Sequence, residues 1–348
     1  MKLIIQIPCF NEAKTLPITL ADLPRKVEGF DQVEWLVIDD GSTDNTIEVA
    51  KESGVDHIIR LSRNQGLARG FRIGLDECLR LGADVVVNTD ADNQYCAANI
   101  PDLTRPILEG RADIVIGTRP IDVIDHFSPL KKLLQKIGSL VVRRVSKIDV
   151  PDAPSGFRAF SRKAAMQLNV FSDYTYTLET IIQAGHKNMA VLSVPIRVNG
   201  FLRPSRLVKG NLSYVLRSAA TILRIFVIYN PFKFFLSLGA LLFLTGFLIG
   251  VRFLFFYFSG YGSGHIQSLI LSSSLLIIGF QTSLFAFMVD LSAVNRKLLE
   301  DIQLKIRGLE KHVNEQRIDR ASPINGLHCN IWSDRNFVQM DSSMEKHP

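Results

Sequence analysis

Two long stretches without a charged side chain constrain the fold of this chain more than any other feature. They are Phe234–Val251 and Ile266–Val289, and the short, glycine-rich segment Ser259–His265 leads into the second. Because the hydrocarbon core of a bilayer needs about 20 apolar residues per helix, both stretches qualify as membrane spans. We therefore predict a two-helix transmembrane hairpin within residues 233–290. A pair of core helices in a soluble protein is disfavoured, because such helices seldom stay uncharged on every side over this length.

Basic residues flank the hairpin at its two ends but not at its joint. Residues 197–233 contain seven Lys and Arg residues and no acidic residue, and Arg296 and Lys297 follow the second span. By the positive-inside rule, we expect the N-terminal domain and both chain ends to be cytoplasmic, at a bacterial inner membrane. Within residues 201–232, apolar residues recur at helical spacing beside basic ones, which predicts interfacial helices on anionic lipids. We assign the net charge of +6 to this contact, so membrane lipids, and no nucleic acid, are the expected partners.

Within a predicted domain of residues 1–200, residues 1–118 alternate between short apolar runs and segments with helical spacing, for example Leu67–Leu81 and Ile100–Leu108, whereas residues 119–200 are less regular. The apolar runs are Leu3–Ile7, Trp35–Ile38, His57–Leu61, Val85–Asn88 and Ile114–Ile116. Strands that alternate with helices are typical of βαβ units, so we predict an α/β domain with a mostly parallel central sheet. Ligands of such sheets bind beyond the carboxyl ends of the strands. The residues that follow each run are therefore the candidates for a functional site.

The residues after the hairpin divide into two segments. Residues 291–318 carry apolar side chains at helical spacing and predict an amphipathic cytoplasmic helix. This helix either pairs with copies of itself, which together with the membrane helices would give a homo-oligomer, or lies on the protein or the membrane. Residues 319–348 are polar and aperiodic, and we expect them to be disordered.

Polar clusters follow the first three predicted strands. The motif Pro8–Glu12 is not a GxGxxG turn, which disfavours a dehydrogenase-type fold, and its Asn11 and its glutamate can hold the hydroxyls of a nucleoside. Asp39 and Asp40 lie side by side, so each needs a base N–H, a ribose hydroxyl or a metal ion as a partner. Gly66, at the start of a helical segment with basic residues nearby, suits a phosphate or a base edge.

A pair of carboxylates follows the fourth predicted strand. Asp90 and Asp92 are two residues apart and point the same way in an extended segment, so both can reach one cation. Hard cations such as Mg²⁺ or Mn²⁺ take carboxylate oxygens and substrate phosphates as ligands. Gln94 continues the alternation and can add a neutral oxygen. The segment predicts a metal site that also holds a diphosphate.

The last cluster is the loop Asp152–Arg158, with the sequence DAPSGFR. The hydroxyl of Ser155, a glycine and the guanidinium of Arg158 can together bind a phosphate. A structural loop with Arg158 in a salt bridge is the alternative reading of this segment.

Together these motifs resemble family 2 glycosyltransferases of the GT-A type, and among them the dolichyl- or polyprenyl-phosphate sugar transferases. The resemblance rests on the order and spacing of PCFNE, DDGS, NQG, TDADNQ, GTR and SGFR. It covers roughly residues 2–230 and includes the two-span hairpin found in many members. The combination is specific, although each motif alone is weak.

The resemblance implies a role for each matching residue. Pro8, Asn11, Glu12 and Asp39 match positions that hold the nucleoside, and Asp90, Asp92 and Gln94 match the metal and diphosphate site. Arg119, Ser155 and Arg158 match groups that meet the acceptor phosphate, and Asp152 matches a carboxylate often assigned as a catalytic base. A phosphate monoester has a second pKa of about 6 and hardly needs a base. Asp152 can therefore instead orient an arginine or polarise the acceptor.

The expected function is inverting transfer of a sugar from a UDP- or GDP-linked donor to a polyprenyl phosphate at the cytoplasmic face of a membrane. A processive polysaccharide synthase with the same donor site is one alternative, but it would carry a QxxRW motif and more spans than the two seen here. A non-catalytic membrane scaffold or lipid carrier is another. It would explain the hairpin but leave Asp90, Asp92 and the SGFR motif without a purpose.

Overall fold

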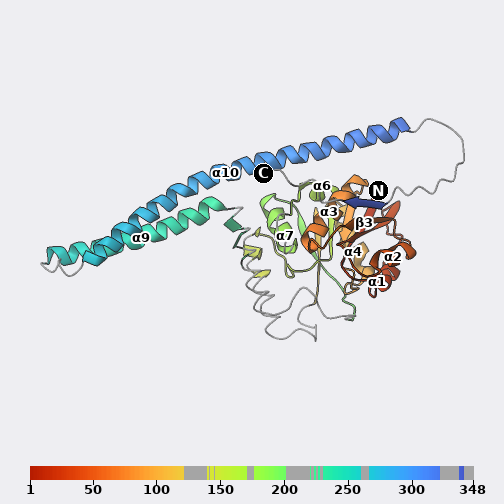
Figure 1. Cartoon of the computed structure of the whole chain (residues 1–348), viewed down its shortest axis with the longest axis horizontal. Helices are drawn as coiled ribbons and strands as arrows, with labels where there is room; N and C mark the ends of the chain where they lie inside the picture. The colour runs from red at the N-terminus through yellow and green to blue at the C-terminus, as the bar shows by residue number, and fades with distance from the viewer. Residues whose placement is uncertain are drawn as a thin grey trace, which may run out of the picture. The chain divides into compact units, whose positions relative to one another are not determined.

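The chain forms two compact units, one of Met1–Ile222 with Arg307–Pro348 and one of Leu223–Ile306 (Figure 1). The computed structural model describes residues 1–120, 139–140, 142–144, 146–170, 176–200, 220, 223–224, 226–227, 230–259, 266–321 and 337–340. The interfacial helices predicted for residues 201–232 lie for the most part outside the described residues.

An eight-stranded sheet is the framework of the first unit. Its strands are β1 (Lys2–Cys9), β2 (Gln32–Asp39), β3 (His57–Leu61), β4 (Val85–Asn88), β5 (Ile114–Thr118), β6 (Arg158–Ser161), β7 (Val191–Pro195) and β8 (Phe337–Met340). Their order across the sheet is β7-β5-β6-β4-β1-β2-β3-β8, and β6 runs antiparallel to both of its neighbours. The other pairings are parallel. The prediction of an α/β domain with a mostly parallel sheet is confirmed.

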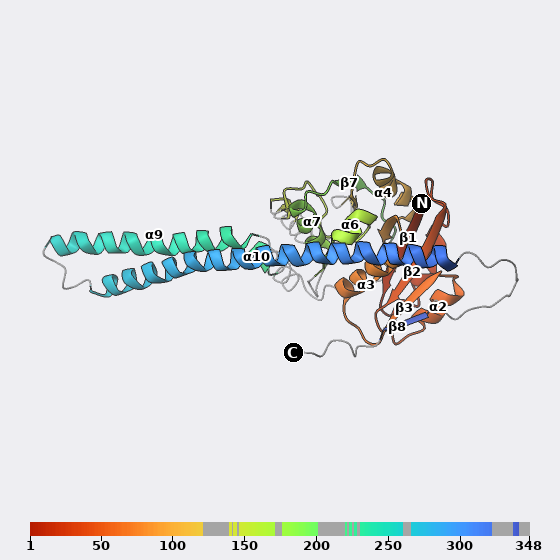
Figure 2. The same cartoon turned by 90° about the horizontal axis from the view of Figure 1, so that it is seen from above.

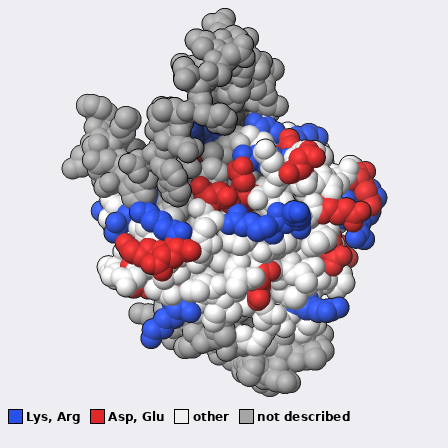
Figure 3. All heavy atoms as spheres, turned by 90° about the vertical axis from the view of Figure 1, so that its right-hand side faces the viewer, with Lys and Arg blue, Asp and Glu red and all other residues white. Residues whose placement is uncertain are grey.

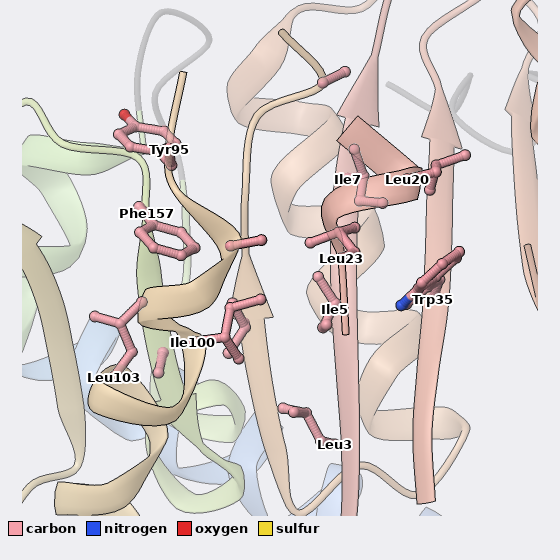
Figure 4. Close-up of a cluster of buried hydrophobic side chains, with 14 of the residues drawn as sticks. Leu3, Ile5, Ile7, Leu20, Leu23, Trp35, Tyr95, Ile100, Leu103 and Phe157 are labelled. Carbon is pink, nitrogen blue, oxygen red and sulfur yellow. The ribbon is translucent and has the colours of Figure 1, made fainter. Parts of the chain in front are cut away.

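Helices cover both faces of this sheet (Figures 1 and 2). They are α1 (Leu16–Asp22), α2 (Thr46–Glu52), α3 (Leu67–Arg80), the short 3₁₀ helix η1 (Ala97–Asn99), α4 (Ile100–Leu108), α6 (Arg162–Gln167) and α7 (Thr177–His186). Because side chains alternate across a strand, Ile5 of β1 joins Leu20 of α1 and Leu103 of α4 in a core cluster on one face (Figure 4). On the other face, α3 covers β1 with Gly74 against Gln6. Each fully buried Leu or Ile side chain in such a core contributes roughly 1.5–3 kcal/mol.

Three elements differ from the sequence prediction. Strand β6 was not predicted, because a four-residue strand that begins with Arg158 has no apolar run to mark it. The tail predicted to be disordered contains β8, which pairs with β3 at the edge of the sheet. The amphipathic helix predicted at 291–318 is not a separate helix, because α10 continues without a break from Ile266 to Ala321.

The second unit contains two long apolar helices, α9 (Pro231–Phe258) and the N-terminal part of α10 (Ile266–Ala321). Each is long and apolar enough to span a bilayer, over Pro231–Phe258 and Ile266–Asn295. Core helices of a soluble protein would be buried, whereas these helices expose large apolar side chains, among them Leu241, Phe247, Phe255, Ile270 and Phe287. Such a surface favours lipid as its surroundings.

Small residues allow α9 and α10 to approach each other closely. A Cβ atom on Gly246 would lie 2.8 Å from the Cβ of Leu275, and one on Gly279 would lie 2.5 Å from the backbone nitrogen of Phe243. The hydroxyl of Ser272 donates a hydrogen bond to the carbonyl of Gly246 at 2.7 Å. Membrane helices associate through such small residues and interhelical hydrogen bonds, because lipid supplies no hydrophobic drive. The packing therefore agrees with the predicted transmembrane hairpin.

Candidate active site

The predicted functional clusters meet at one edge of the sheet. Strands β1, β2, β4 and β5 are parallel to one another, so their carboxyl ends share this edge. The residues at these ends or just after them are Pro8–Glu12, Asp39–Asp40, Asp90–Gln94 and Arg119. Strand β6 runs the opposite way, so the segment just before it, Asp152–Gly156, lies at the same edge.

The two adjacent aspartates at the end of β2 have different partners. Asp39 is fully buried, and its Oδ1 accepts the main-chain N–H of Ser42 at 3.2 Å. Asp40 accepts the main-chain N–H groups of Gln65 at 2.7 Å and of Gly66 at 2.8 Å. Burial raises the pKa of both carboxyls, and these N–H donors oppose the rise. Asp40 and Gly66, predicted as nucleotide contacts, thus bind each other and fix the loop after β3.

The PCFNE segment is tied to the turn after β2. Asn11 has a positive φ of 55°, and its Oδ1 accepts the main-chain N–H of Thr43 at 2.8 Å. Its own N–H donates to the hydroxyl of Ser42 at 2.8 Å. Glu12 is buried and accepts the hydroxyl of Thr15 at 2.6 Å, and Pro8 is half-buried. These bonds give the predicted nucleoside end of the site a defined shape without a ligand.

The predicted metal segment supplies two half-buried carboxylates. Asp92 accepts a hydrogen bond from Nε2 of Gln94 at 2.8 Å, so these two predicted ligands contact each other. Asp90 faces the SGFR loop, where a Cβ on Gly156 would lie 3.2 Å from its Oδ1. The described residues contain no group of three or more His, Cys, Asp or Glu that could hold a metal ion. Two carboxylates nevertheless fit Mg²⁺ or Mn²⁺, which take their other ligands from water and from substrate phosphates.

Arg119 and Asp152 form a bidentate ion pair. Nε of Arg119 donates to Oδ2 of Asp152 at 2.7 Å and Nη2 donates to Oδ1 at 2.9 Å, while the Arg119 main-chain N–H also reaches Oδ2 at 3.2 Å. Asp152 is fully buried and the Arg119 side chain is 12% exposed. Burial alone would lower the pKa of this guanidinium, but the Asp152 carboxylate raises it above the usual value. The carboxylate is therefore placed to hold an arginine.

Arg158 does not line the site. It is fully buried, and its guanidinium donates to the carbonyls of Ser155, Ala153 and Thr177 and to the hydroxyl of Thr180, at 2.6–2.8 Å. Burial lowers its pKa to about 10, so it stays charged at neutral pH. The expectation that it meets the acceptor phosphate is not supported by this geometry. The side chain instead ties the loop before β6 to the start of α7.

Ser155 and two tyrosines are further features of the loop Asp152–Arg158. The hydroxyl of Ser155 is buried and has no hydrogen-bond partner in the described part of the chain, so it can serve a ligand. Tyr95 and Tyr176 both contact Gly156 and were not among the predicted site residues. No spacing or motif marks them, because their roles depend on contacts between distant segments.

Charges of both signs are mixed on the face of the molecule drawn in Figure 3. Lys and Arg side chains lie beside Asp and Glu side chains there, rather than in one continuous basic band. The first unit contains exposed ion pairs such as Arg111 with Glu109. Pairs of this kind contribute little to stability. The net positive charge of the chain is therefore not concentrated on this face.

Comparisons with known proteins identify relatives of this chain. A sequence profile described as glycosyl transferase family 2 matches residues 4–168. The chain is 32% identical over 201 residues to an uncharacterized protein of Methanocaldococcus jannaschii, a match that covers 56% of this chain and 81% of that protein. It is 26% identical over 204 residues to the polyprenol monophosphomannose synthase of Mycolicibacterium smegmatis, with 56% and 76% covered.

The fold also resembles a solved structure. Glucosyl-3-phosphoglycerate synthase from Mycobacterium tuberculosis, in complex with Mn²⁺, UDP and glucosyl-3-phosphoglycerate, aligns with a TM-score of 0.52 at 18% identity. The alignment covers 65% of this chain and 78% of that one. At this identity the likeness shows a shared fold, which is the GT-A-like arrangement predicted from the sequence.

Proposed function

Because the chain belongs to glycosyl transferase family 2, we propose that it transfers a sugar from a UDP- or GDP-linked donor to a polyprenyl phosphate at the cytoplasmic face of a membrane. The observation that carries this proposal is Arg119, which a buried carboxylate holds at the sheet edge that also bears Asp90 and Asp92. The positively charged guanidinium of Arg119 suits an acceptor that is itself a phosphate. The similarity to a polyprenol monophosphomannose synthase and the two apolar helices support a lipid as its carrier.

On the donor side, Asn11, Glu12 and Asp39 hold the nucleoside in this proposal. Asp90, Asp92 and Gln94 hold Mg²⁺ or Mn²⁺. When bound, the cation neutralises the negative charge that grows on the diphosphate as it leaves. A phosphate oxygen of the acceptor forms the new bond to the anomeric carbon as the bond to the diphosphate breaks. The nucleoside diphosphate departs on the opposite side, so the configuration inverts.

On the acceptor side, Arg119 and the hydroxyl of Ser155 receive the phosphate. Asp152 engages Nε and Nη2 of Arg119, and a guanidinium has further donors on Nη1 that can meet a phosphate. The second pKa of a phosphate monoester is about 6, so the acceptor is already a nucleophile at neutral pH. We therefore assign Asp152 to positioning Arg119 rather than to removing a proton.

The full chain in lipid nanodiscs is expected to form a polyprenyl-phosphate sugar from one member of a panel of UDP- and GDP-sugars. The assay contains Mn²⁺ and a short polyprenyl phosphate, and product is detected by mass spectrometry. The matched control acceptor is the same polyprenol without phosphate, which should accept no sugar because it lacks the group that Arg119 binds. Transfer to free sugars or polysaccharide, and to no lipid phosphate, would show that the proposed function is wrong.

The orientation of the hairpin makes a separate prediction. In a chain with Cys96 and Cys329 replaced by serine, Gly262→Cys should react with an impermeant thiol reagent added outside intact cells. Arg296→Cys should react only after the cells are opened, because the basic residues beside it stay inside. Cys9 and Cys78 are buried and contribute no background. Labelling of Arg296→Cys but not Gly262→Cys from outside would reverse the proposed topology.

A further inference from the structure

Two buried tyrosines hold the peptide groups of Gly156 from both sides. The main-chain N–H of Gly156 donates to the hydroxyl of Tyr95 at 3.0 Å. Its carbonyl accepts Nδ2 of Asn88 at 2.9 Å and the hydroxyl of Tyr176 at 3.3 Å. Both tyrosines are at most 5% exposed. Gly156 lies in the loop Asp152–Arg158, here called the acceptor loop, and is therefore fixed by side chains and not by a strand ladder.

Tyr95 comes from the metal segment, whereas Gly156 belongs to the acceptor loop. Tyr95 lies three residues after Asp92, and its ring stacks on Phe157 with 5.1 Å between ring centroids and 10° between planes (Figure 4). The Asp90 carboxylate packs against Gly156, since a Cβ there would lie 3.2 Å from Oδ1. One hydroxyl thus joins the segment that bears the predicted metal ligands to the loop that bears Asp152.

The donors to the Gly156 carbonyl are anchored in the centre of the sheet. Asn88 of β4 accepts Nε2 of Gln6 of β1 at 2.9 Å, and its Nδ2 also donates to the hydroxyl of Tyr176 at 2.9 Å. Tyr176 stacks on Phe71 of α3 with ring centroids 3.8 Å apart. The carbonyl of Gly156 therefore has two donors, both anchored in the core, whereas its N–H has Tyr95.

We propose that Tyr95 is a positioning residue for sugar transfer, which sets the acceptor loop against the metal-binding segment through the N–H of Gly156. The proposal rests on the proposed function and adds a residue that no motif contains. Because donor and acceptor must meet in line, a small shift between the two segments slows the reaction without loosening either substrate.

Tyr95→Phe in the full chain tests the proposal, and Tyr176→Phe is its matched control. Both variants remove one buried phenol hydroxyl and keep a stacked ring. Tyr95→Phe leaves the Gly156 N–H without its partner, so kcat should fall about 10- to 100-fold. The Michaelis constant for the nucleotide-sugar and the affinity for Mn²⁺ with UDP or GDP should stay within about twofold of wild type. In Tyr176→Phe, Asn88 still serves the carbonyl, so kcat should change by no more than about threefold.

Hydrogen exchange of the peptide covering residues 153–157 supplies a readout that does not depend on the acceptor. Exchange should be faster in Tyr95→Phe than in wild type, because the Gly156 amide loses its acceptor, and should change less in Tyr176→Phe. Unchanged exchange, or a kcat within twofold of wild type in Tyr95→Phe, overturns the proposal. Parallel losses in kcat, nucleotide affinity and thermal midpoint would show a structural role only and overturn it too. A wild type that never uses a lipid phosphate refutes the proposed function instead, and exchange then decides the role of Tyr95.

Discussion

Replacing Asp92 by asparagine is expected to lower sugar transfer by about 10²–10³-fold while the chain keeps its fold. The side chain keeps its shape and can still accept the hydrogen bond that Gln94 donates to it. It loses the charge that a hard cation requires. Without the cation, the charge on the departing diphosphate is no longer neutralised. The measurement is kcat for transfer at saturating nucleotide-sugar, together with the far-ultraviolet circular dichroism spectrum as a check on folding.

Asp102→Asn is the matched control for this variant. Asp102 lies in the first turn of α4, accepts a hydrogen bond from Asn99 at 3.0 Å and is not among the predicted site residues. It should transfer sugar at close to the wild-type rate. EDTA should inhibit the wild type and added Mn²⁺ or Mg²⁺ should restore it. Full activity in EDTA, or equal losses in the two variants, would refute the metal assignment.

The parts of the fold that could be predicted are those in which one local pattern decides the structure. The runs at His57–Leu61 and Val85–Asn88 became β3 and β4 with the same bounds. The second run is buried at every position, as suits a strand that is covered on both faces. The helix at Ile100–Leu108 was also placed correctly. Strand β6 was missed, because burial of Arg158 depends on acceptors from Ala153 and from α7 that no local pattern reveals.

In the candidate site, too, some features could be predicted from the sequence and others could not. The parallel strands determine that Asp39, Asp90 and Arg119 share an edge, so position along the chain was enough to group them. What each side chain contacts depends on long-range geometry. The sequence left open whether Asp152 is a base or holds an arginine, and the structure places it on Arg119. Tyr95 could not be found from the sequence, because its partner Gly156 is 61 residues away.

Breaking the ion pair of Arg119 with Asp152 is expected to destabilise the chain strongly. Asp152→Ala or Arg119→Met should each lower the free energy of unfolding by about 3–5 kcal/mol, because each leaves a buried charge without its partner. Asp152 is fully buried, so water cannot replace the lost guanidinium. The double variant Arg119→Met/Asp152→Leu removes both charges and should recover much of this stability. Chemical denaturation of the full chain in detergent measures all four proteins.

Transfer should not recover with stability in that double variant. The acceptor phosphate would lose a charge-assisted contact of about 1.5–3 kcal/mol, so the Michaelis constant for the lipid phosphate should rise about 10- to 150-fold. The constant for the nucleotide-sugar should stay near the wild-type value, because no predicted donor contact is removed. A double variant that is stable and fully active would show that Arg119 does not bind the acceptor.

Milder variants then separate the two roles of Asp152. Arg119→Lys keeps the charge but loses the planar fork that the carboxylate engages, and Asp152→Asn keeps the shape but loses the charge. If Asp152 acts through Arg119, both changes weaken the same contact. The loss of transfer in the variant Arg119→Lys/Asp152→Asn, expressed as a free energy, should then be smaller than the sum of the two single losses. If Asp152 removes a proton, Asp152→Asn should cost far more than Arg119→Lys and should abolish the acid limb of the pH–rate profile. The bidentate geometry at 2.7 and 2.9 Å favours the first outcome, because both oxygens of the carboxylate already accept hydrogen bonds from the guanidinium.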